Sequence, residues 1–138
     1  MFSLKYVFLF FASFLLLPKD GPVIQQKAID EKKNIAVYFC GSDWCSSCHK
    51  FKNTVLALPA IDSLLKQGYV FYEADFPQRK KQADSTKTLN DFLAEKLNPN
   101  GVFPALVISD ENFRIKYAQY GSKASAETVL SNLKTHSQ

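Results

Sequence analysis

Two cysteines in the stretch GSDWCSSCHK (residues 41–50), Cys45 and Cys48, are separated by two residues. Trp44 precedes the pair, and His49 follows it directly. Cysteines at this spacing are typical of a redox dithiol, of a covalent haem attachment (C-x-x-C-H) or of part of a metal site. The sequence around the pair must therefore indicate which of these three kinds of chemistry applies.

The haem interpretation uses Cys45, Cys48 and His49 as the attachment string. A six-coordinate haem takes a second axial ligand, usually methionine or histidine. The only methionine of the chain is Met1, and the only other histidine is His136, close to the C-terminus. Haem-attachment strings also usually lie in helical folds, whereas an apolar, β-rich run leads into this one. These two features do not favour a c-type haem protein, which stays open as an alternative because the attachment string is present.

A zinc site would draw on Cys40, Cys45, Cys48 and His49. Cys48 and His49 are adjacent and point to different faces of a helix, whereas structural zinc sites usually take their ligands as two separated pairs. We therefore expect neither a metal nor an organic cofactor. Cys40 ends an apolar run, so we expect it to be a buried, inert thiol.

The run NIAVYFC (residues 34–40) precedes the cysteine pair and is apolar, β-branched and aromatic throughout. Such a run predicts a strand that is buried on both faces. A helix is predicted from near Cys45 to Pro59. Three apolar residues should share one side of this helix: Phe51, Val55 and Leu58. The cysteine pair thus lies where a buried strand gives way to a helix.

The start of a helix has unpaired N–H groups and a partial positive charge, which favour a thiolate over a thiol. We expect Cys45, in the first turn, to be the exposed attacking sulfur. Cys48 lies on the same face one turn deeper, where it can close a small disulfide ring and release whatever is bound to Cys45. Ser46 and Ser47 add no charge, so the thiolate is stabilised less than a cation or histidine there would allow.

The remaining patterns predict one α/β domain with the element order α-β-α-β-α-β-β-α. Further strands are expected at residues 69–75, 105–109 and 113–120, and further helices at residues 22–33, 88–97 and 124–135. This order indicates parallel strands joined by helices and then an antiparallel pair at the edge of the sheet.

The N-terminus differs from the rest, because residues 6–17 form an uncharged apolar run after Lys5. Twelve residues suit the core of a signal peptide, whereas a membrane-spanning helix takes about 20. We expect residues 1–21 to be a signal peptide or an uncleaved membrane anchor, with the domain at residues 22–138. Either form places the domain outside the cytoplasm.

The chain of 138 residues is 46% hydrophobic and carries a net charge of +4, a composition that indicates a globular domain. Its densest basic run, Arg79 to Lys81, is too small to indicate nucleic-acid binding. Three cysteines are an odd number, which does not favour a structural disulfide framework.

The motif AVYFCGSDWCSSCHKF (residues 36–51) resembles the active-site region of thioredoxin-fold disulfide oxidoreductases, where a strand and a short loop lead into W-C-x-x-C and a helix. GVFPALVI (residues 101–108) resembles the second signature of the family, a cis-proline that opens a strand. The resemblance covers nearly all of residues 22–138 and is greatest to the exported, periplasmic thioredoxin-like branch. It implies a thioredoxin-like α/β fold with a central mixed four-stranded sheet flanked by helices.

The resemblance also implies roles for five residues. Cys45 is the nucleophile and Cys48 the resolving cysteine, while Trp44, Phe103 and Pro104, with Pro104 in cis facing Cys45, bind substrate. The backbone beside Pro104 would then pair with an extended substrate strand.

Two positions depart from the family pattern. Many relatives bury an acid in the first strand below the cysteines, and here that position holds Tyr38 or its neighbour Phe39. Proton transfer from the resolving thiol must therefore use another group. Phe103 is also bulkier than the residue that usually precedes the proline, which restricts access of substrate.

These observations predict a thiol–disulfide oxidoreductase that acts on protein disulfides outside the cytoplasm, with a lean towards reduction. An oxidase or isomerase of the same fold and a binding module without activity are the alternatives besides haem binding. The expected partners are substrate proteins with disulfides or thiols, and a dithiol protein that donates electrons, of which a membrane-embedded carrier is one type.

Overall fold

The computed structural model describes residues 22–137. The strands are β1 (Asn34–Cys40), β2 (Tyr69–Asp75), β3 (Ala105–Ser109) and β4 (Ile115–Tyr120). The helices are α2 (Val23–Glu31), α3 (Ser46–Phe51), the π-helix η2 (Lys52–Leu56), α4 (Pro59–Gly68), α5 (Asp84–Leu97) and α6 (Ala126–His136). The predicted signal peptide or anchor at residues 1–21 lies outside the described residues.

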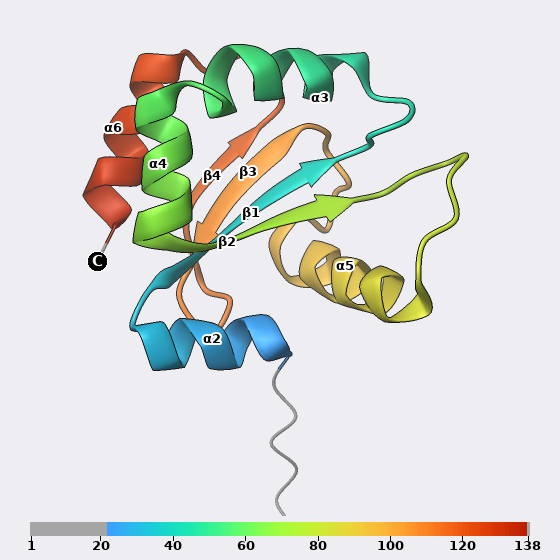
Figure 1. The fold of residues 1–138 in the computed structure, drawn as a ribbon, viewed down its shortest axis with the longest axis horizontal. Helices are drawn as coiled ribbons and strands as arrows, with labels where there is room; N and C mark the ends of the chain where they lie inside the picture. Colours follow the sequence, from blue (N-terminus) through green and yellow to red (C-terminus); the bar gives the residue numbers. More distant parts are fainter. Residues whose placement is uncertain (1–21, 138) are drawn as a thin grey trace, which may run out of the picture.

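The four strands form one mixed sheet in the order β2-β1-β3-β4, which confirms the predicted sheet (Figure 1). Only β1 and β2 run parallel, and β3 is antiparallel to both β1 and β4. The expected run of parallel strands is therefore wrong beyond β2. Since Phe39 pairs with Ala105, β3 begins beside the end of β1. This reversal places the segment before Ala105 next to the loop that carries the cysteines.

Strand β1 is buried along its whole length, as its composition predicts. Its side chains alternate between two apolar layers, one on each face of the sheet. One layer contains Tyr38 and Cys40 with residues of α3, η2, α4 and α6, and the other contains Phe39 with residues of α2 and α5. Figure 1 shows α4 and α6 together on one side of the sheet and α5 on the other. The cysteines thus belong to the layer that Tyr38 enters.

The segment after the cysteines differs from the single helix predicted to end at Pro59. Helix α3 passes into η2, where the N–H of Ala57 bonds to the carbonyl of Lys52, five residues earlier. The wider turn rotates the chain, so that Phe51, Val55 and Leu56 are buried while Leu58 is 40% exposed. The prediction that Leu58 lies on the buried side is therefore wrong.

Helix α4 differs from the prediction, in which Pro59 ends a helix. Pro59 instead occupies the first turn of α4, where no N–H partner is needed and the fixed φ of proline suits a helix. Ile61 and Leu65, four residues apart, form its buried face. That spacing was the available sequence signal.

Other boundaries shift by a few residues. Helix α5 begins at Asp84 rather than Thr88, and α6 begins after Ser125, whose hydroxyl accepts the N–H of Thr128. Strand β4 begins at Ile115 rather than at residue 113, because Phe113 has a positive φ of 60° that an extended strand does not allow. Within residues 22–137 the structure has no helix that is both long enough and apolar enough to cross a membrane.

Candidate active site

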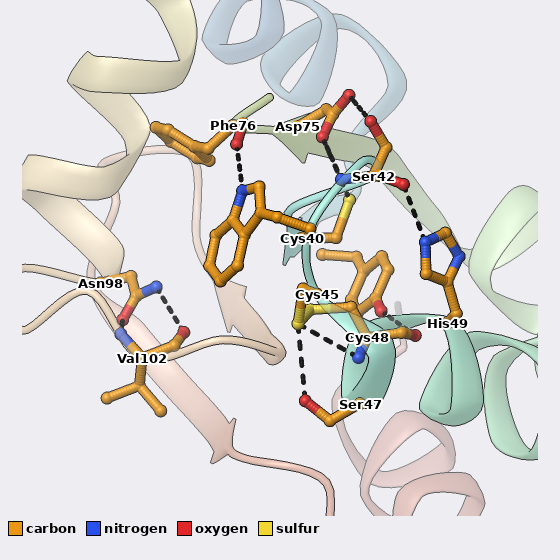
Figure 2. The surroundings of a disulfide bond; sticks show 12 residues. Cys40, Ser42, Cys45, Ser47, Cys48, His49, Asp75, Phe76, Asn98 and Val102 are labelled. Atoms are coloured by element: carbon orange, nitrogen blue, oxygen red, sulfur yellow. Dashed lines mark hydrogen bonds between the residues drawn. A yellow bond between two sulfur atoms is a disulfide. The ribbon is translucent and has the colours of Figure 1, made fainter. Parts of the chain in front are cut away.

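Cys45 and Cys48 form a disulfide at the start of α3, with the two sulfurs 2.18 Å apart and the Cα atoms 5.3 Å apart (Figure 2). Cys45 is the N-cap residue of α3, and its backbone is extended. Its sulfur accepts the N–H of Cys48 at 3.2 Å, as a capping side chain does. The pair therefore lies at the strand-to-helix junction that the sequence predicts.

The hydroxyl of Ser47 lies 3.5 Å from the sulfur of Cys45 (Figure 2). Together with the N–H of Cys48, it places two hydrogen-bonding groups around this sulfur. Cys45 was expected to be exposed, and in the disulfide it is only 5% exposed. The exposed position expected for Cys45 is therefore wrong for the disulfide form, in which Cys45 is bonded to Cys48 and belongs to the apolar layer under α3.

Three aromatic rings lie side by side next to the disulfide. The ring of Phe103 meets those of Trp44 and Phe76 edge-on, with centroids 5.4 and 5.5 Å away. The indole N–H of Trp44 donates to the carbonyl of Phe76 at 2.7 Å (Figure 2). Gly41 permits this arrangement, because a Cβ there would lie 2.2 Å from the indole. We call Trp44, Phe76 and Phe103 the aromatic cluster; sequence reasoning missed Phe76 and Gly41.

The Phe103–Pro104 peptide bond is cis, in agreement with the resemblance. Pro104 is buried, and its carbonyl accepts the N–H of Gly121 at 2.7 Å, so the segment before β3 is tied to the end of β4. Trp44, at 38% exposure, and the half-buried Phe103 are accessible from outside. Their roles in binding substrate, and that of Pro104, stay predictions.

Cys40 is a free thiol and is buried, as expected. It lies opposite Asp75 on the neighbouring strand, and its sulfur is 3.9 Å from a carboxylate oxygen of that residue. Burial first, and then the negative charges of Asp75 and Glu73, raise the pKa of Cys40 to about 12. The thiolate that exchange requires is therefore scarce at this cysteine.

Tyr38 occupies the position below the cysteines, and Phe39 points to the opposite layer. The hydroxyl of Tyr38 donates to the carbonyl of Cys48 at 2.7 Å. Burial raises the pKa of Tyr38 far above its ordinary value, with smaller contributions from Cys40 and Glu73. Because this phenol stays protonated, it cannot take a proton from Cys48 at neutral pH.

A small cavity of about 50 Å³ adjoins Cys48. Its walls include Tyr38, Glu73 of β2 and Lys52 of η2. The ammonium of Lys52 pairs with the carboxylate of Glu73 at 2.5 Å. No sequence motif indicates a role for Glu73, although its position on a strand beside the predicted β1 was a usable signal.

The loop between β1 and the cysteines is fixed through Ser42. Its N–H and hydroxyl both donate to Asp75, at 2.8 and 2.6 Å, and its carbonyl lies 2.8 Å from Nε2 of His49 (Figure 2). No group of three or more histidine, cysteine, aspartate or glutamate residues in residues 22–137 is arranged to hold a metal ion. Among the residues considered for zinc, Cys45 and Cys48 are bonded to each other, Cys40 contacts Asp75 and His49 contacts Ser42.

Asp43 connects the same loop to the segment after β2. Its carboxylate accepts the backbone N–H groups of Gln78, Arg79 and Lys80 at 2.8 to 2.9 Å. These bonds lower the pKa of Asp43 to about 2, so the carboxylate stays charged at neutral pH. The basic run that begins at Arg79 is thereby held close to Trp44.

The fold and the cysteine pair define a thioredoxin-like protein. The family model described as thioredoxin-like domain matches residues 23–135, and the chain belongs to that family. Among curated proteins, the disulfide bond reductase DsbH of Chlamydia pneumoniae is 30% identical over 108 residues. That match covers 75% of this chain and 64% of the relative, so the chain spans less than two thirds of the length of the relative.

Solved structures agree on the fold. A DsbH oxidoreductase superposes with a TM-score of 0.68 and 26% identity over 80% of this chain and 79% of the other. A disulphide isomerase from Xylella fastidiosa Temecula1 superposes with a TM-score of 0.56 and 14% identity, over 81% of this chain and 84% of the other. A thioredoxin from Thermus thermophilus superposes with a TM-score of 0.57 and 18% identity, over 81% of this chain and 79% of the other. At these low identities, the isomerase and the thioredoxin show only that the fold is shared.

Proposed function

We propose that this protein is a thiol–disulfide oxidoreductase that reduces disulfides of protein substrates outside the cytoplasm. The observation that carries the proposal is the Cys45–Cys48 bond at the start of α3. A disulfide that closes and opens within one helical turn is suited to two-electron exchange. The aromatic cluster beside it offers an apolar surface to a substrate chain.

In the reducing direction, the Cys45 thiolate attacks one sulfur of a substrate disulfide, and the other substrate sulfur leaves as a thiolate. The mixed disulfide on Cys45 is then attacked by the thiolate of Cys48, which forms the Cys45–Cys48 bond and releases the second substrate sulfur. Two electrons pass to the substrate, and its two thiolates take up two protons. The N–H of Cys48 and the hydroxyl of Ser47 lie where they stabilise the Cys45 anion.

Two observations support reduction over oxidation. Ser46 and Ser47 supply no cation or histidine between the cysteines, and such groups make a disulfide more oxidising by favouring the thiolate. The curated relative from Chlamydia pneumoniae is also named a reductase. An oxidase or isomerase would use the same two sulfurs with the opposite or an alternating flow of electrons.

The proposed compartment is supported by residues 6–17, which have the length of a signal-peptide core. Outside the cytoplasm a reductase needs a source of electrons, and we propose a dithiol protein that reduces the Cys45–Cys48 bond by the same exchange. Residues 1–21, if they stay attached, would hold the domain at the membrane surface. No cofactor takes part in this cycle.

A two-direction assay tests the proposal. The protein, kept reduced by a dithiol, should catalyse the reduction of insulin disulfides, and Cys45→Ser should not. The oxidised protein should be a poor catalyst of disulfide formation in reduced ribonuclease. Faster oxidation than reduction would make the protein an oxidase, and an absorbance band of covalently bound haem in the protein purified from its source would favour the haem alternative.

A further inference from the structure

Resolution of the mixed disulfide requires that the Cys48 thiol lose a proton, and this inference rests on the proposed function. Cys48 is only 2% exposed, so bulk water does not reach it freely. A proton acceptor must therefore lie within the protein or be connected to the thiol through a cavity. The 50 Å³ cavity beside Cys48 provides such a connection, because its volume accommodates water.

Most groups around this cavity are unsuited to accept a proton at neutral pH. Tyr38 and Cys40 both have a raised pKa and stay protonated. Lys52 is a cation without a lone pair to offer while it is charged. Two candidates remain among the lining residues, Glu73 and His49.

One ring nitrogen of His49 already has a hydrogen-bond partner. Its Nε2 lies 2.8 Å from the carbonyl oxygen of Ser42, and since a carbonyl only accepts, Nε2 carries the proton. The other ring nitrogen, Nδ1, keeps its lone pair, but Figure 2 shows it on the side of the ring away from the cysteine pair. Glu73, in contrast, has a carboxylate that is paired with Lys52 and borders the cavity.

We propose that Glu73 is the proton acceptor of the resolving step. The Cys48 thiol passes its proton through water in the cavity to the Glu73 carboxylate. The Cys48 thiolate then attacks the sulfur of Cys45, the bond between Cys45 and the substrate breaks, and the substrate sulfur leaves with the electron pair. The protonated Glu73 returns its proton to solvent, since the residue is exposed at the outer end of the cavity.

The position of Glu73 in the sheet supports this role. Glu73 is the direct partner of Tyr38 in the β1–β2 register, so the acid lies one strand away from the residue below the cysteines. Around the cavity, the charged and titratable groups beside it are Lys52 from η2, Tyr38 and Cys40 from β1 and His49 from α3. On its other side, Glu73 shares a second hollow with Asp62 and Lys66 from α4. The ammonium of Lys52 pairs directly with the Glu73 carboxylate, so the ion pair holds this carboxylate at the wall of the cavity.

In the test, the reduced protein is mixed with one equivalent of the aromatic disulfide DTNB, and the release of coloured thiolate is followed. Attack by Cys45 releases the first coloured thiolate, and attack by Cys48 releases the second, so stopped-flow absorbance separates the two steps. In Glu73→Gln we expect the first phase to be unchanged and the second to slow at least about tenfold at pH 7. The second phase of the variant should rise steeply with pH as Cys48 ionises by itself, whereas the wild-type rate depends less on pH.

Three further variants separate this role from a structural one. Glu73→Asp retains a carboxylate and should recover part of the second-phase rate. Asp91→Asn removes a carboxylate that pairs with Lys87 on α5, on the opposite face of the sheet, and should leave both phases unchanged. His49→Asn should likewise retain the second phase.

Equal slowing of both phases in Glu73→Gln, an unchanged second phase, or slowing by His49→Asn in its place would overturn the assignment to Glu73. In these cases the release of two thiolates by the wild type would still support the proposed exchange. A wild type that never releases the second thiolate would instead defeat the proposed function itself.

Discussion

The end of β1 and the start of α3 both hold buried cysteines, but they surround the sulfur with opposite groups. At Cys45, the N–H of Cys48 and the hydroxyl of Ser47 approach the sulfur. At Cys40, the nearest polar partner is the carboxylate of Asp75, and Glu73 adds a second negative charge. Exposure does not distinguish them, at 5% for Cys45 and 6% for Cys40. From this difference we infer that hydrogen-bond donors and charges, rather than burial, favour exchange at Cys45 over Cys40.

The largest expected effect comes from removing each sulfur in turn. Cys45→Ser should lower the turnover of a protein disulfide by at least about 10³-fold, because the attacking atom is gone. Cys40→Ala should leave turnover close to that of the wild type. Insulin reduction under a fixed supply of dithiol measures both, and a comparable loss in the two variants would remove the distinction between the regions.

A second difference should appear between the two cysteines of the pair. Cys48→Ser removes the resolving sulfur, so substrates should accumulate as mixed disulfides on Cys45. Cys45→Ser should accumulate none, because Cys48 is the more deeply buried of the two. Intact-protein mass after exposure to a disulfide peptide gives the amount of adduct. Equal adduct on both variants would reverse or abolish the assignment of roles.

The charge argument at Cys40 predicts a gain of reactivity. In the wild type, alkylation of Cys40 should become fast only as the pH approaches about 12, the raised pKa of this thiol. Asp75→Asn removes a negative charge beside the sulfur, which lowers that pKa and increases the thiolate fraction at every lower pH. A shift of one unit would speed alkylation at pH 8 by about tenfold.

Asp75→Asn also weakens the contacts of Asp75 with Ser42, so access to Cys40 needs a control. Ser42→Ala removes the hydroxyl contact and keeps the carboxylate. An equal rise in alkylation in Ser42→Ala would mean that access, and not charge, limits Cys40.

The smallest expected effect concerns the hydroxyl beside Cys45. At 3.5 Å the contact with Ser47 is long, so Ser47→Ala should slow the first exchange phase only about twofold to threefold. Ser46→Ala, at the exposed neighbouring position, is the matched control and should have no effect. Stopped-flow measurement of the first phase resolves such a difference; identical rates for both variants would leave the Cys48 N–H as the main donor.

Patterns local in the sequence predicted the fold well. The apolar run of β1 and the helical spacing of Leu93 and Leu97 carry their own periodicity, and both elements form. Helix α4 was missed because proline both ends and begins helices, and only the buried pair Ile61 and Leu65 decides between them. The antiparallel direction of β3 was missed because it depends on where the chain returns after α5.

The site residues also fall into those that a local pattern predicts and those that depend on the fold. Cys45 and Cys48 are neighbours in sequence, so their spacing alone predicts that they meet. Phe76 and Glu73 reach the site from β2 and the segment after it, about 30 residues from the cysteines. Their contacts with Trp44 and the cavity depend on strand register, which no local pattern contains.

Equilibration of the protein with glutathione redox buffers, followed by alkylation and peptide mapping, tests the central claim most directly. We predict one two-electron transition, in which the Cys45–Cys48 bond opens and closes while Cys40 stays a thiol throughout. For a reductase, the midpoint should be more negative than that of the glutathione couple. Failure of Cys45 and Cys48 to bond to each other in any buffer, or a disulfide that includes Cys40, would contradict the account.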